Sequence, residues 1–385
     1  MRRQHVAGSM HVLLTINAGS SSVRLAAFRA AAVAAGPLVS RRHERADLDP
    51  GAALDDLRAG LPGATAWTCV HRVVHGGATL SAPCLVDDTV ERAIAACAGL
   101  APLHNPRALA WIEACRAAFG ADIGQVAVFD TGFFADLPAV AQTYALPHAL
   151  CTAHGLRRYG FHGLAHAALW SRWRACGGAA DARIVTLQLG SGCSACAIAG
   201  GRALDTSMGF SPLEGLVMAT RPGDLDAGLV LHLQQVLGAD VHEIERLLSS
   251  ESGLRGMAGG SGDMRELLAR DDERARLAVE VYCYRVRKYV GAYLAVLGGA
   301  DAIVFGGGVG EHAPAVRAAI LDGLGWAGIA LDTYANAVLL GREGRISPPR
   351  ARVAVHVFQV DEAQALATAA LPCVERRAAA RARGA

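Results

Sequence analysis

The sequence has no hydrophobic run long enough to form a membrane span. None of its apolar runs reaches the roughly 18 residues that a span needs. The first ten residues, MRRQHVAGSM, lack the apolar core of a secretory signal, and Met10 is an alternative start. The net charge is only +2, so no broad basic surface for nucleic acid is indicated. These absences argue against a membrane-bound and against a nucleic-acid-binding protein.

A disulfide framework is also absent. The ten cysteines are scattered along the chain without paired spacing, which predicts a reducing, cytoplasmic environment. Cys193 and Cys196 form a CxxC, but both lie in a run of small residues typical of a strand, and no second cysteine pair is nearby. We therefore expect these two thiols to pack in the interior, in preference to redox or metal chemistry.

The sequence does contain material for two α/β domains. Its 385 residues exceed one ordinary core, and 52% of them are hydrophobic against 19% charged. The segment RALAWIEACRAAFG has helical periodicity, with Leu109, Ile112, Cys115 and Phe119 on roughly one face and an end at Gly120. Strands alternating with helices favour an α/β fold. Short apolar runs that end in glycine or a polar residue predict the strands Val12–Ile16, Cys69–Val74, Val126–Phe129, Ile184–Leu189, Ala302–Phe305 and Val353–Val360.

An internal repeat indicates that the two halves are related. INAGSSSVRLAAF aligns without gaps on LQLGSGCSACAIA, so that Gly19 falls on Gly190, Ser20 on Ser191 and Leu25 on Cys196. Each copy has the pattern strand, small polar corner, strand. VAVFDTG in the first half and AIVFGGGVGE in the second follow at similar distances. A duplicated domain with a cleft between the halves would explain the pattern, and chance similarity of two glycine hairpins is the alternative.

The first polar corner, Asn17-Ala18-Gly19-Ser20-Ser21-Ser22, is longer and more hydroxylated than a plain hairpin requires. Backbone N–H groups and hydroxyls at such a corner can approach an anion closely. The corner therefore predicts a phosphate site, with a solvated loop as the alternative.

Acidic residues follow two of the predicted strands. Asp130 comes after VAVF, and Asp361 and Glu362 lie in QVDEAQ. In α/β sheets, ligands gather at the carboxyl ends of strands, and a buried carboxylate there requires a cation. Asp130 and Glu362 are therefore candidate partners of one Mg²⁺ that carries phosphates. A helix cap or a salt bridge is the alternative for each acid alone.

Basic residues supply the opposite charge. Arg72, in HRVVHGG, and Arg221, in MATRPGD, can clamp a carboxylate or phosphate in a bidentate manner. Surface ion pairs are the alternative. In RRYGFHGLAH the pair His162 and His166 has zinc-like spacing but lacks the glutamate of the metalloprotease pattern, so zinc is disfavoured and core packing is an equal alternative. The glycine loop GGGVGE is neither a Walker loop nor a good dinucleotide fingerprint.

Together these segments resemble the acetate kinase family, in the acetokinase branch of the sugar kinase/actin/Hsp70-like ATPases. The matching motifs occur in the family's order from residue 12 to about residue 365: NAGSSSVR, HRVVHGG, APLHNP, VAVFDTGF, RRYGFHG, DTSMGFSPLEGL, TRPGDLD, SGDMREL, VFGGGVGEH and VDEAQ. The resemblance implies an α/β fold of two related domains of the ribonuclease H-like/actin-like ATPase type flanking a central cleft. We expect an N-terminal domain at 11–135 that includes a C-terminal helix at about 365–385, and a second domain at 136–364 that binds nucleotide and forms a homodimer.

The resemblance also implies the roles of individual residues. Arg72 and Arg221 would hold the carboxylate and the moving phosphoryl group, and His162 would stabilise that group in the transition state. The magnesium site (Mn²⁺ is possible) would comprise Asn17, Asp130 and Glu362. The apolar substrate pocket would comprise Val74, Leu103, Phe161 and Pro212 beside Arg72, and His104 matches another active-site histidine. ATP or ADP would be bound by Asn17, Ser20, Ser22, Arg24, Gln188, Gly190, Ser191, Gly192, Asp263, Met264, Arg265, Gly306, Gly307, Gly308, Val309, Gly310 and His312.

The implied reaction is reversible transfer of a phosphoryl group from ATP to acetate. A carboxylate with a pKa near ~4 is already ionised at neutral pH and needs no general base. It needs neutralisation of charge, because two anions must meet. The sequence departs from the family at Arg24 (usually lysine), Gln188 (histidine), Ser191 and His312 (asparagine), and at Leu164-Ala165 within the altered HGTSH motif. These departures leave turnover and phosphate-donor affinity open.

Three other functions remain open at this stage. A kinase for propionate or another short acid fits the same residues, because one methylene is worth only about 1–3 kcal/mol. A non-catalytic nucleotide-binding regulator would explain Gln188 and Ser191 as marks of lost activity. A sugar kinase is disfavoured, because a hydroxyl-binding pocket would not be lined by Val74, Leu103 and Phe161.

Overall fold

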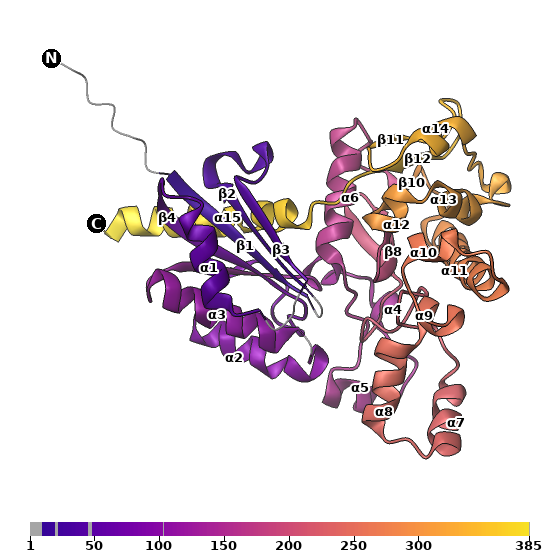
Figure 1. The fold of residues 1–385 in the computed structure, drawn as a ribbon, viewed down its shortest axis with the longest axis horizontal. Helices are drawn as coiled ribbons and strands as arrows, with labels where there is room; N and C mark the ends of the chain where they lie inside the picture. Colours follow the sequence, from indigo (N-terminus) through magenta and orange to yellow (C-terminus); the bar gives the residue numbers. More distant parts are fainter. Residues whose placement is uncertain (1–9, 20–21, 45–47, 103, 385) are drawn as a thin grey trace. The chain divides into compact units, whose positions relative to one another are not determined.

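The computed structural model describes residues 10–19, 22–44, 48–102 and 104–384, and the chain divides into two compact units (Figure 1). Unit 1 comprises Met1–Gly132 and Asp361–Ala385, and unit 2 comprises Phe133–Val360. No helix among the described residues combines the length and hydropathy needed to cross a membrane.

Unit 1 is built on a six-stranded mixed sheet in the order β3-β2-β1-β4-β6-β5. β1 runs antiparallel to β2 and parallel to β4, and β4 runs parallel to β6. The strands are β1 (Met10–Ala18), β2 (Val23–Arg29), β3 (Val39–His43), β4 (Ala64–Val73), β5 (Cys84–Leu85) and β6 (Gly124–Phe129). The helices of this unit are η1 (Ala30–Ala35), α1 (Pro50–Ala59), α2 (Asp88–Ala96), η2 (Ala98–Leu100), α3 (Asn105–Phe119) and α15 (Glu362–Gly384).

Helices cover both faces of this sheet. Leu14 and Ile16 of β1 pack with Leu54 of α1 and Trp111 of α3 in one buried cluster. The C-terminal helix α15 packs on β6, β1 and β4, and none of its residues belongs to that cluster. The sheet is therefore the middle of three layers, which buries the apolar face of each of its parallel strands.

The predicted helix exists as α3, and it ends before Gly120, which has a φ of 95°. Its buried face is set by Ala108, Trp111, Ile112 and Cys115. The predicted face was therefore right at two positions, whereas Leu109 and Phe119 lie at the margins and are only partly buried. The long indole of Trp111 fills the space nearest the sheet, which the periodicity alone did not indicate.

Unit 2 repeats this architecture. Its sheet has the order β11-β12-β10-β7-β8-β9. Its strands are β7 (Arg183–Leu189), β8 (Cys193–Ala199), β9 (Arg202–Thr206), β10 (Ala302–Gly306), β11 (Gly344–Arg345) and β12 (Ala354–Val357). Its helices are α4 (Ala139–Gln142), α5 (His148–His154), α6 (Gly163–Ala175), α7 (Ala227–Leu237), α8 (Val241–Arg246), α9 (Gly253–Ala258), α10 (Met264–Ala269), α11 (Glu273–Leu297), α12 (Gly307–His312), α13 (Pro314–Leu321) and α14 (Thr333–Val338). Three further short turns are η3 (Gly132–Phe134, which begins at the end of unit 1), the π-helical η4 (Leu247–Glu251) and η5 (Gly325–Ala327).

The two sheets have one topology, which confirms the predicted repeat. When β7, β8, β9, β10, β11 and β12 are matched to β1, β2, β3, β4, β5 and β6, neighbour order and strand direction agree throughout. The six predicted strands are all present, although the last extends only over Ala354–Val357 and not over Val353–Val360.

Two details of the predicted repeat were wrong. In β1 and β2 Asn17 pairs with Arg24, whereas in β7 and β8 Gln188 pairs with Ser194. The second corner is therefore one residue shorter, so the gapless alignment slips by one after it. The matching of VAVFDTG with AIVFGGGVGE also fails: β10 corresponds to β4, because helices inserted after β9 lengthen the path to β10.

Candidate functional site

In unit 1, four predicted site residues from distant parts of the sequence form one hydrogen-bonded set. Arg72 lies near the end of β4, Asp130 follows β6, Asn17 lies near the end of β1, and Glu362 begins α15. The carboxyl ends of three parallel strands meet at one edge of the sheet, which explains why these side chains converge.

The contacts run in a line through this set. Arg72 Nε donates to Asp130 Oδ2 at 3.0 Å, and its Nη2 forms an ion pair with the same oxygen. Arg72 Nη1 donates to Asn17 Oδ1 at 2.9 Å, and Asn17 Nδ2 donates to Glu362 Oε2 at 2.7 Å. The side chain of Asp130 is only 2% exposed and that of Arg72 15%, so the pair lies largely outside solvent screening.

Burial sets the charge balance of this pair. It raises the pKa of Asp130; the guanidinium of Arg72 opposes this shift, and the negative charge of Glu362 adds to it. Burial alone would lower the pKa of Arg72, but Asp130 and Glu362 outweigh it and leave that pKa raised. Two carboxylates therefore share a region that one arginine neutralises incompletely, so a further cation is favoured there.

This oxygen-rich set fits magnesium in its chemistry. Asp130, Glu362 and the amide oxygen of Asn17 are hard oxygen donors, and Mg²⁺ takes one or two carboxylates together with water and phosphate oxygens. No group of three or more His, Cys, Asp or Glu side chains that could hold a metal was found among the described residues. The candidate that the donor chemistry supports in unit 1 is a mixed carboxylate and amide site.

The predicted phosphate corner of unit 1 is only partly visible. Gly19 N donates to Ser22 O at 2.8 Å, and Arg107 from α3 donates through Nη1 to Gly19 O at 2.7 Å. Arg24 pairs with Asn17 across the strands. Two predicted residues, Ser20 of the corner and Leu103 of the substrate pocket, lie outside the described residues.

Unit 2 presents a second set at the corresponding strand ends. Gln188 of β7 lies in register with Ser194 of β8 on one side and with Gly306 of β10 on the other. The corner between β7 and β8 is closed by a hydrogen bond of 3.1 Å from Gly190 N to Gly192 O, and Ser191 O accepts from Ala219 N at 2.9 Å. Gln188 Oε1 is buried and has no hydrogen-bond partner among the described residues.

Gly192 brings His162 and Arg221 to the same point. A Cβ atom at Gly192 would lie 2.9 Å from Arg221 Nη2 and 3.2 Å from His162 Cε1, closer than ordinary van der Waals contact. Glycine therefore lets the corner approach both side chains closely. Arg221 and His162, the two basic side chains of unit 2 that were predicted for catalysis, are therefore neighbours.

Arg221 lacks a carboxylate partner in the part of the chain that the structure describes, although it is partly buried. Its Nη1 donates to Pro212 O at 2.7 Å, which fixes the guanidinium without neutralising it. Burial lowers the pKa of Arg221, and the nearby Cys193 thiol opposes this shift. A cation held in this way favours a bound anion, because an anion restores the stabilisation that water no longer supplies.

His162 is held by both its backbone and its ring. It is the one non-glycine residue among those described with a positive φ, 60°, and it immediately precedes α6. Its Nδ1 is hydrogen-bonded to Ser194 Oγ at 2.9 Å. Ser194 Oγ also contacts His166 Nε2 at 2.8 Å, so the two histidines share one hydroxyl group and do not form a zinc pair.

The predicted pocket residues lie in both units. Val74, just after β4, and Phe161, just before His162, are buried. Pro212 lies in the loop that also carries Glu214, which pairs with Arg158 and accepts from Tyr144 at 2.5 Å. His104 precedes α3, whose first residue, Asn105, is hydrogen-bonded to the backbone of His75.

The predicted nucleotide segment is a short helix and not a loop. Gly306 ends β10, and α12 begins at Gly307, which has a φ of 76° and whose Cβ would lie 2.6 Å from Leu189 O. That conformation turns the chain from strand to helix and favours glycine at position 307, and a Cβ at Gly306 would lie 2.7 Å from Leu169 Cδ2. Asp263 accepts from Arg265 N at 2.9 Å and caps α10, in which Met264 is buried and Arg265 is exposed.

Sequence reasoning missed Arg317, a fully buried residue that supports this segment. Its guanidinium donates to Gly310 O at 2.8 Å and Glu311 O at 3.1 Å, and to Asn336 Oδ1 at 2.8 Å. Burial lowers its pKa to about 10, so it remains a cation at neutral pH. A single arginine among the apolar residues PAVRAAIL is the signal that was available in the sequence.

Several histidine, aspartate and cysteine side chains make contacts that stabilise the fold. His71 is buried and bonds Gln125 Oε1 through Nε2 at 2.7 Å. Asp361 accepts from the backbone of Ala363 and Gln364 and caps α15. Cys193 and Cys196 are buried in β8, and all ten cysteines are free, which confirms that the CxxC packs in the interior.

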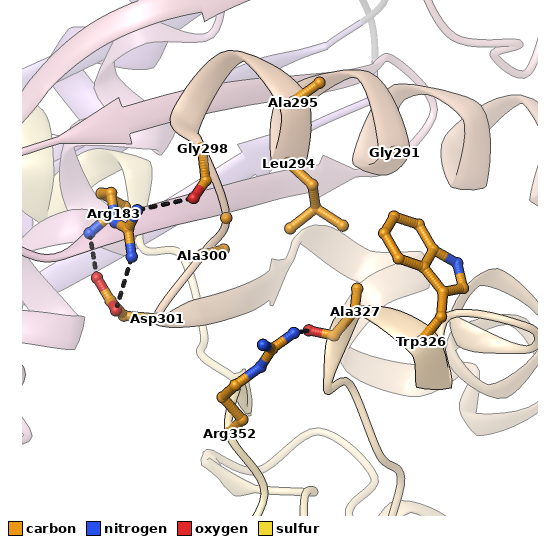
Figure 2. Close-up of a pocket in the computed structure, with 11 residues that line it drawn as sticks. Arg183, Gly291, Leu294, Ala295, Gly298, Ala300, Asp301, Trp326, Ala327 and Arg352 are labelled. Atoms are coloured by element: carbon orange, nitrogen blue, oxygen red, sulfur yellow. Dashed lines mark hydrogen bonds and ion pairs between the residues drawn. The ribbon is translucent and has the colours of Figure 1, made fainter.

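A cavity of about 430 Å³ in unit 2 contains none of the predicted residues (Figure 2). It lies between the end of α11 and the turn η5. Arg183 in its wall is paired with Asp301 at 3.7 Å, and Arg352 donates to Ala327 O at 2.6 Å. The rest of the wall that the figure labels is apolar or glycine, apart from the exposed indole of Trp326, so no set of polar groups converges on one ligand there.

Comparisons with known proteins identify relatives over most of the chain. The profile of the acetokinase family matches residues 64–368. Acetate kinase of Chloroherpeton thalassium is 48% identical over 314 residues, which cover 80% of this chain and 75% of the relative. The crystal structure of Porphyromonas gingivalis acetate kinase superposes with a TM-score of 0.85 at 33% identity, covering 94% of this chain and 100% of the other. A propionate kinase from Francisella tularensis gives 0.84 at 32% identity, covering 94% and 99%.

The buried His166 predicts how stability depends on pH. Burial lowers its pKa to about 3, with a smaller contribution from His162, whereas an unfolded histidine titrates near ~6.5. Between these values the unfolded chain binds one more proton, so this residue lowers the free energy of unfolding as pH falls from about 6.5 towards 3. Above that window its contribution is constant.

We expect the variant His166→Gln to lose free energy of unfolding less steeply between pH 6 and 4, by up to about 1.4 kcal/mol per pH unit. Urea unfolding at a series of pH values measures the slope. The exposed His148→Gln is the matched control and should keep the parent slope. Equal slopes in His166→Gln and the parent would show that His166 is not held neutral.

Proposed function

The chain belongs to the acetokinase family, and on that basis we propose that it transfers the γ-phosphoryl group of ATP to acetate, reversibly forming acetyl phosphate and ADP. The observation that carries this proposal is the partly buried Arg221, which lacks a carboxylate partner in the described part of the chain and lies with His162 at the corner of Gly192. Such a cation suits an anionic substrate.

The acceptor explains why no general base is needed. Acetate is ionised at neutral pH and can attack phosphorus directly. The barrier comes from the approach of two anions and from the charge that builds up on the transferred group. Neutralisation of charge and in-line positioning are therefore the main tasks of the protein.

We assign neutralisation to two sets of residues, one in each unit. In unit 2, Arg221 and His162 would hold the phosphoryl group. In unit 1, Arg72 would hold the acetate carboxylate, and its bonds to Asp130 and Asn17 orient the guanidinium for this contact. The acid beside Arg72 thus positions it and is not needed to remove a proton.

Magnesium would be held by Asp130, Glu362 and Asn17. These side chains already lie in one hydrogen-bonded set, and the raised pKa of Asp130 reflects burial together with the charge of Glu362. When bound, the ion neutralises charge on the phosphate oxygens. Mn²⁺ suits the same donors.

Apolar residues support a short alkyl substituent on the acid. Val74 directly follows β4, which carries Arg72, and Phe161 directly precedes His162. Both apolar residues are buried, and Pro212 O accepts from Arg221. A sugar would leave hydroxyl groups unpaired against such residues. The Francisella propionate kinase is as similar in structure as the acetate kinase, so propionate is the second candidate acid.

The departures at Arg24, Gln188, Ser191 and His312 bear on the phosphate donor. Gln188 is mostly buried in β7 and Ser191 forms the corner beside it. Both arginines, His162 and both acids are retained, and this supports an active enzyme over a nucleotide-binding regulator.

A panel of acids tests this function. The purified chain with Mg²⁺ and ATP should convert acetate to acetyl phosphate, trapped with hydroxylamine as the hydroxamate. We expect kcat/KM for acetate to exceed that for butyrate, with propionate between them. A higher value for propionate would reassign the substrate, and ATP binding without any hydroxamate would favour the regulator. Pyrophosphate serves as the alternative donor.

Substitution of the arginines tests the assigned neutralisation. Arg72→Ala and Arg221→Ala should each lower kcat/KM for acetate by about 10²–10⁴-fold, because each removes a charge that opposes the developing anion. The exposed Arg274→Ala is the control and should keep full activity. Circular dichroism and thermal unfolding would verify the fold, since Asp130 loses its partner in Arg72→Ala. Near-parental rates in both variants would contradict the assignment.

We also propose a homodimer formed through unit 2. None of the eleven residues of α7 is buried, although its sequence is AGLVLHLQQVL. Leu231, Val236 and Leu237 are about 60% exposed, and Val241, at the start of α8, is 65% exposed. An apolar helix without cover is typical of a protein interface, and a second copy of the chain presents the same surface.

The mass in solution tests the dimer. The parent chain should have twice its 39.9 kDa mass by light scattering, and the double variant Leu231→Glu, Val236→Glu should be monomeric, because charges cannot be buried in an apolar contact. Val140→Glu, at a residue that is 91% exposed in α4, is the control. A double variant that remains dimeric would place the interface elsewhere.

A further inference from the structure

We propose that Ser194 and His166 are positioning residues: Ser194 Oγ accepts from His162 Nδ1–H, so that the second proton of the His162 imidazolium is at Nε2 and is donated to the phosphoryl group. The role of His162 itself rests on the proposed function. The hydrogen-bond assignment does not, because it follows from contacts within unit 2.

Four side chains form an unbroken hydrogen-bonded line. His162 Nδ1 lies 2.9 Å from Ser194 Oγ, which lies 2.8 Å from His166 Nε2. His166 Nδ1 lies 2.7 Å from Thr186 Oγ1, which is 3.5 Å from Cys196 O. Ser194, His166 and Thr186 are fully buried, so water does not replace any of these bonds.

The carbonyl at the end of the line fixes its direction. Cys196 O can only accept, so the hydroxyl of Thr186 donates to it and accepts from His166 Nδ1–H. His166 is neutral because burial lowers its pKa to about 3, and a neutral ring protonated at Nδ1 accepts at Nε2. Ser194 therefore donates to His166 and accepts from His162 Nδ1–H.

The other nitrogen of His162 lies at the corner. A Cβ at Gly192 would lie 3.3 Å from His162 Nε2 and 2.9 Å from Arg221 Nη2. Among the described residues, the contacts place the titratable groups of Arg221 and His166 near this ring. The positive φ of His162 holds its backbone in a conformation that a histidine seldom adopts, so both backbone and ring are fixed for one orientation.

The repeat shows that this device is particular to unit 2. Ser194 pairs with Gln188 at the strand position where Arg24 pairs with Asn17 in unit 1. At this strand position unit 2 therefore has the small hydroxyl side chain of Ser194, whereas unit 1 has the long cationic side chain of Arg24. Both imidazoles contact the one hydroxyl oxygen of Ser194.

Variants at Ser194 separate positioning from packing. We expect Ser194→Ala to lower kcat for acetate about 10- to 100-fold, with the KM for ATP changed less than about twofold, because the ring loses its acceptor while the nucleotide contacts remain. Ser194→Thr restores a hydroxyl and should recover most of kcat. Thr15→Val removes a buried hydroxyl that bonds only Ala26 O and is the matched control. Unchanged kcat in Ser194→Ala would overturn the proposal.

Nitrogen NMR of the ¹⁵N-histidine-labelled protein tests the assignment without any assay of activity. His162 and His166, identified by the signals lost in His162→Gln and His166→Gln, should both be protonated at Nδ1, the less common form. In Ser194→Ala the signal of His162 should move towards the Nε2-protonated form. Protonation of His166 at Nε2 in the parent chain would overturn the proposal even if the kinase is active. An inactive chain with both rings protonated at Nδ1 would contradict only the proposed function.

Discussion

The chemistry of this protein depends on how it keeps cations in sites that water leaves incompletely solvated. Arg72 and Arg221 solve the problem in opposite ways. Arg72 is paired with Asp130, and the charge of Glu362 also favours its ionised form, so Arg72 stays protonated. Arg221 is held only by a carbonyl, so its charge is available to a ligand. The protein sets one arginine in place with a carboxylate, and in the proposed function an anionic substrate would complete the other.

Both environments are built on the same sheet topology, which the two units share. Each unit places the ends of three parallel strands at one edge, and each has a hairpin corner there. In unit 1 the edge carries acids and an amide, which suit a metal ion. In unit 2 it carries Gln188, Ser194 and glycines, which suit close approach of phosphates. In the proposed function, the same backbone would thus support two kinds of ligand through a few side chains at equivalent positions.

Much of this fold could be predicted from the sequence, because apolar runs and glycine ends mark buried parallel strands. The partnership of Asp130 and Glu362 was predicted from their positions after strands, Asn17 was added to them by the family resemblance, and the bonds of Arg72 to Asp130 and Asn17 come from the structure. The corner length was not predicted, because a one-residue difference in a glycine-rich turn leaves no trace in a gapless alignment. The counterpart of β10 was also misassigned, since inserted helices change spacing along the chain without changing the position in the sheet.

Buried polar support was the part that pattern reasoning missed. Arg317 is the single arginine among the apolar residues PAVRAAIL, but the sequence does not indicate which acceptors its side chain reaches. These are the last carbonyl groups of α12 and the carbonyl that follows α14. The side chain of Arg317 thereby connects the glycine segment of α12 to the end of α14. The glycine segment GGGVGE is consequently not a portable module: transplanting it into another scaffold, or exchanging it for a homologous stretch, would also require the recipient to carry an arginine and its acceptors in register.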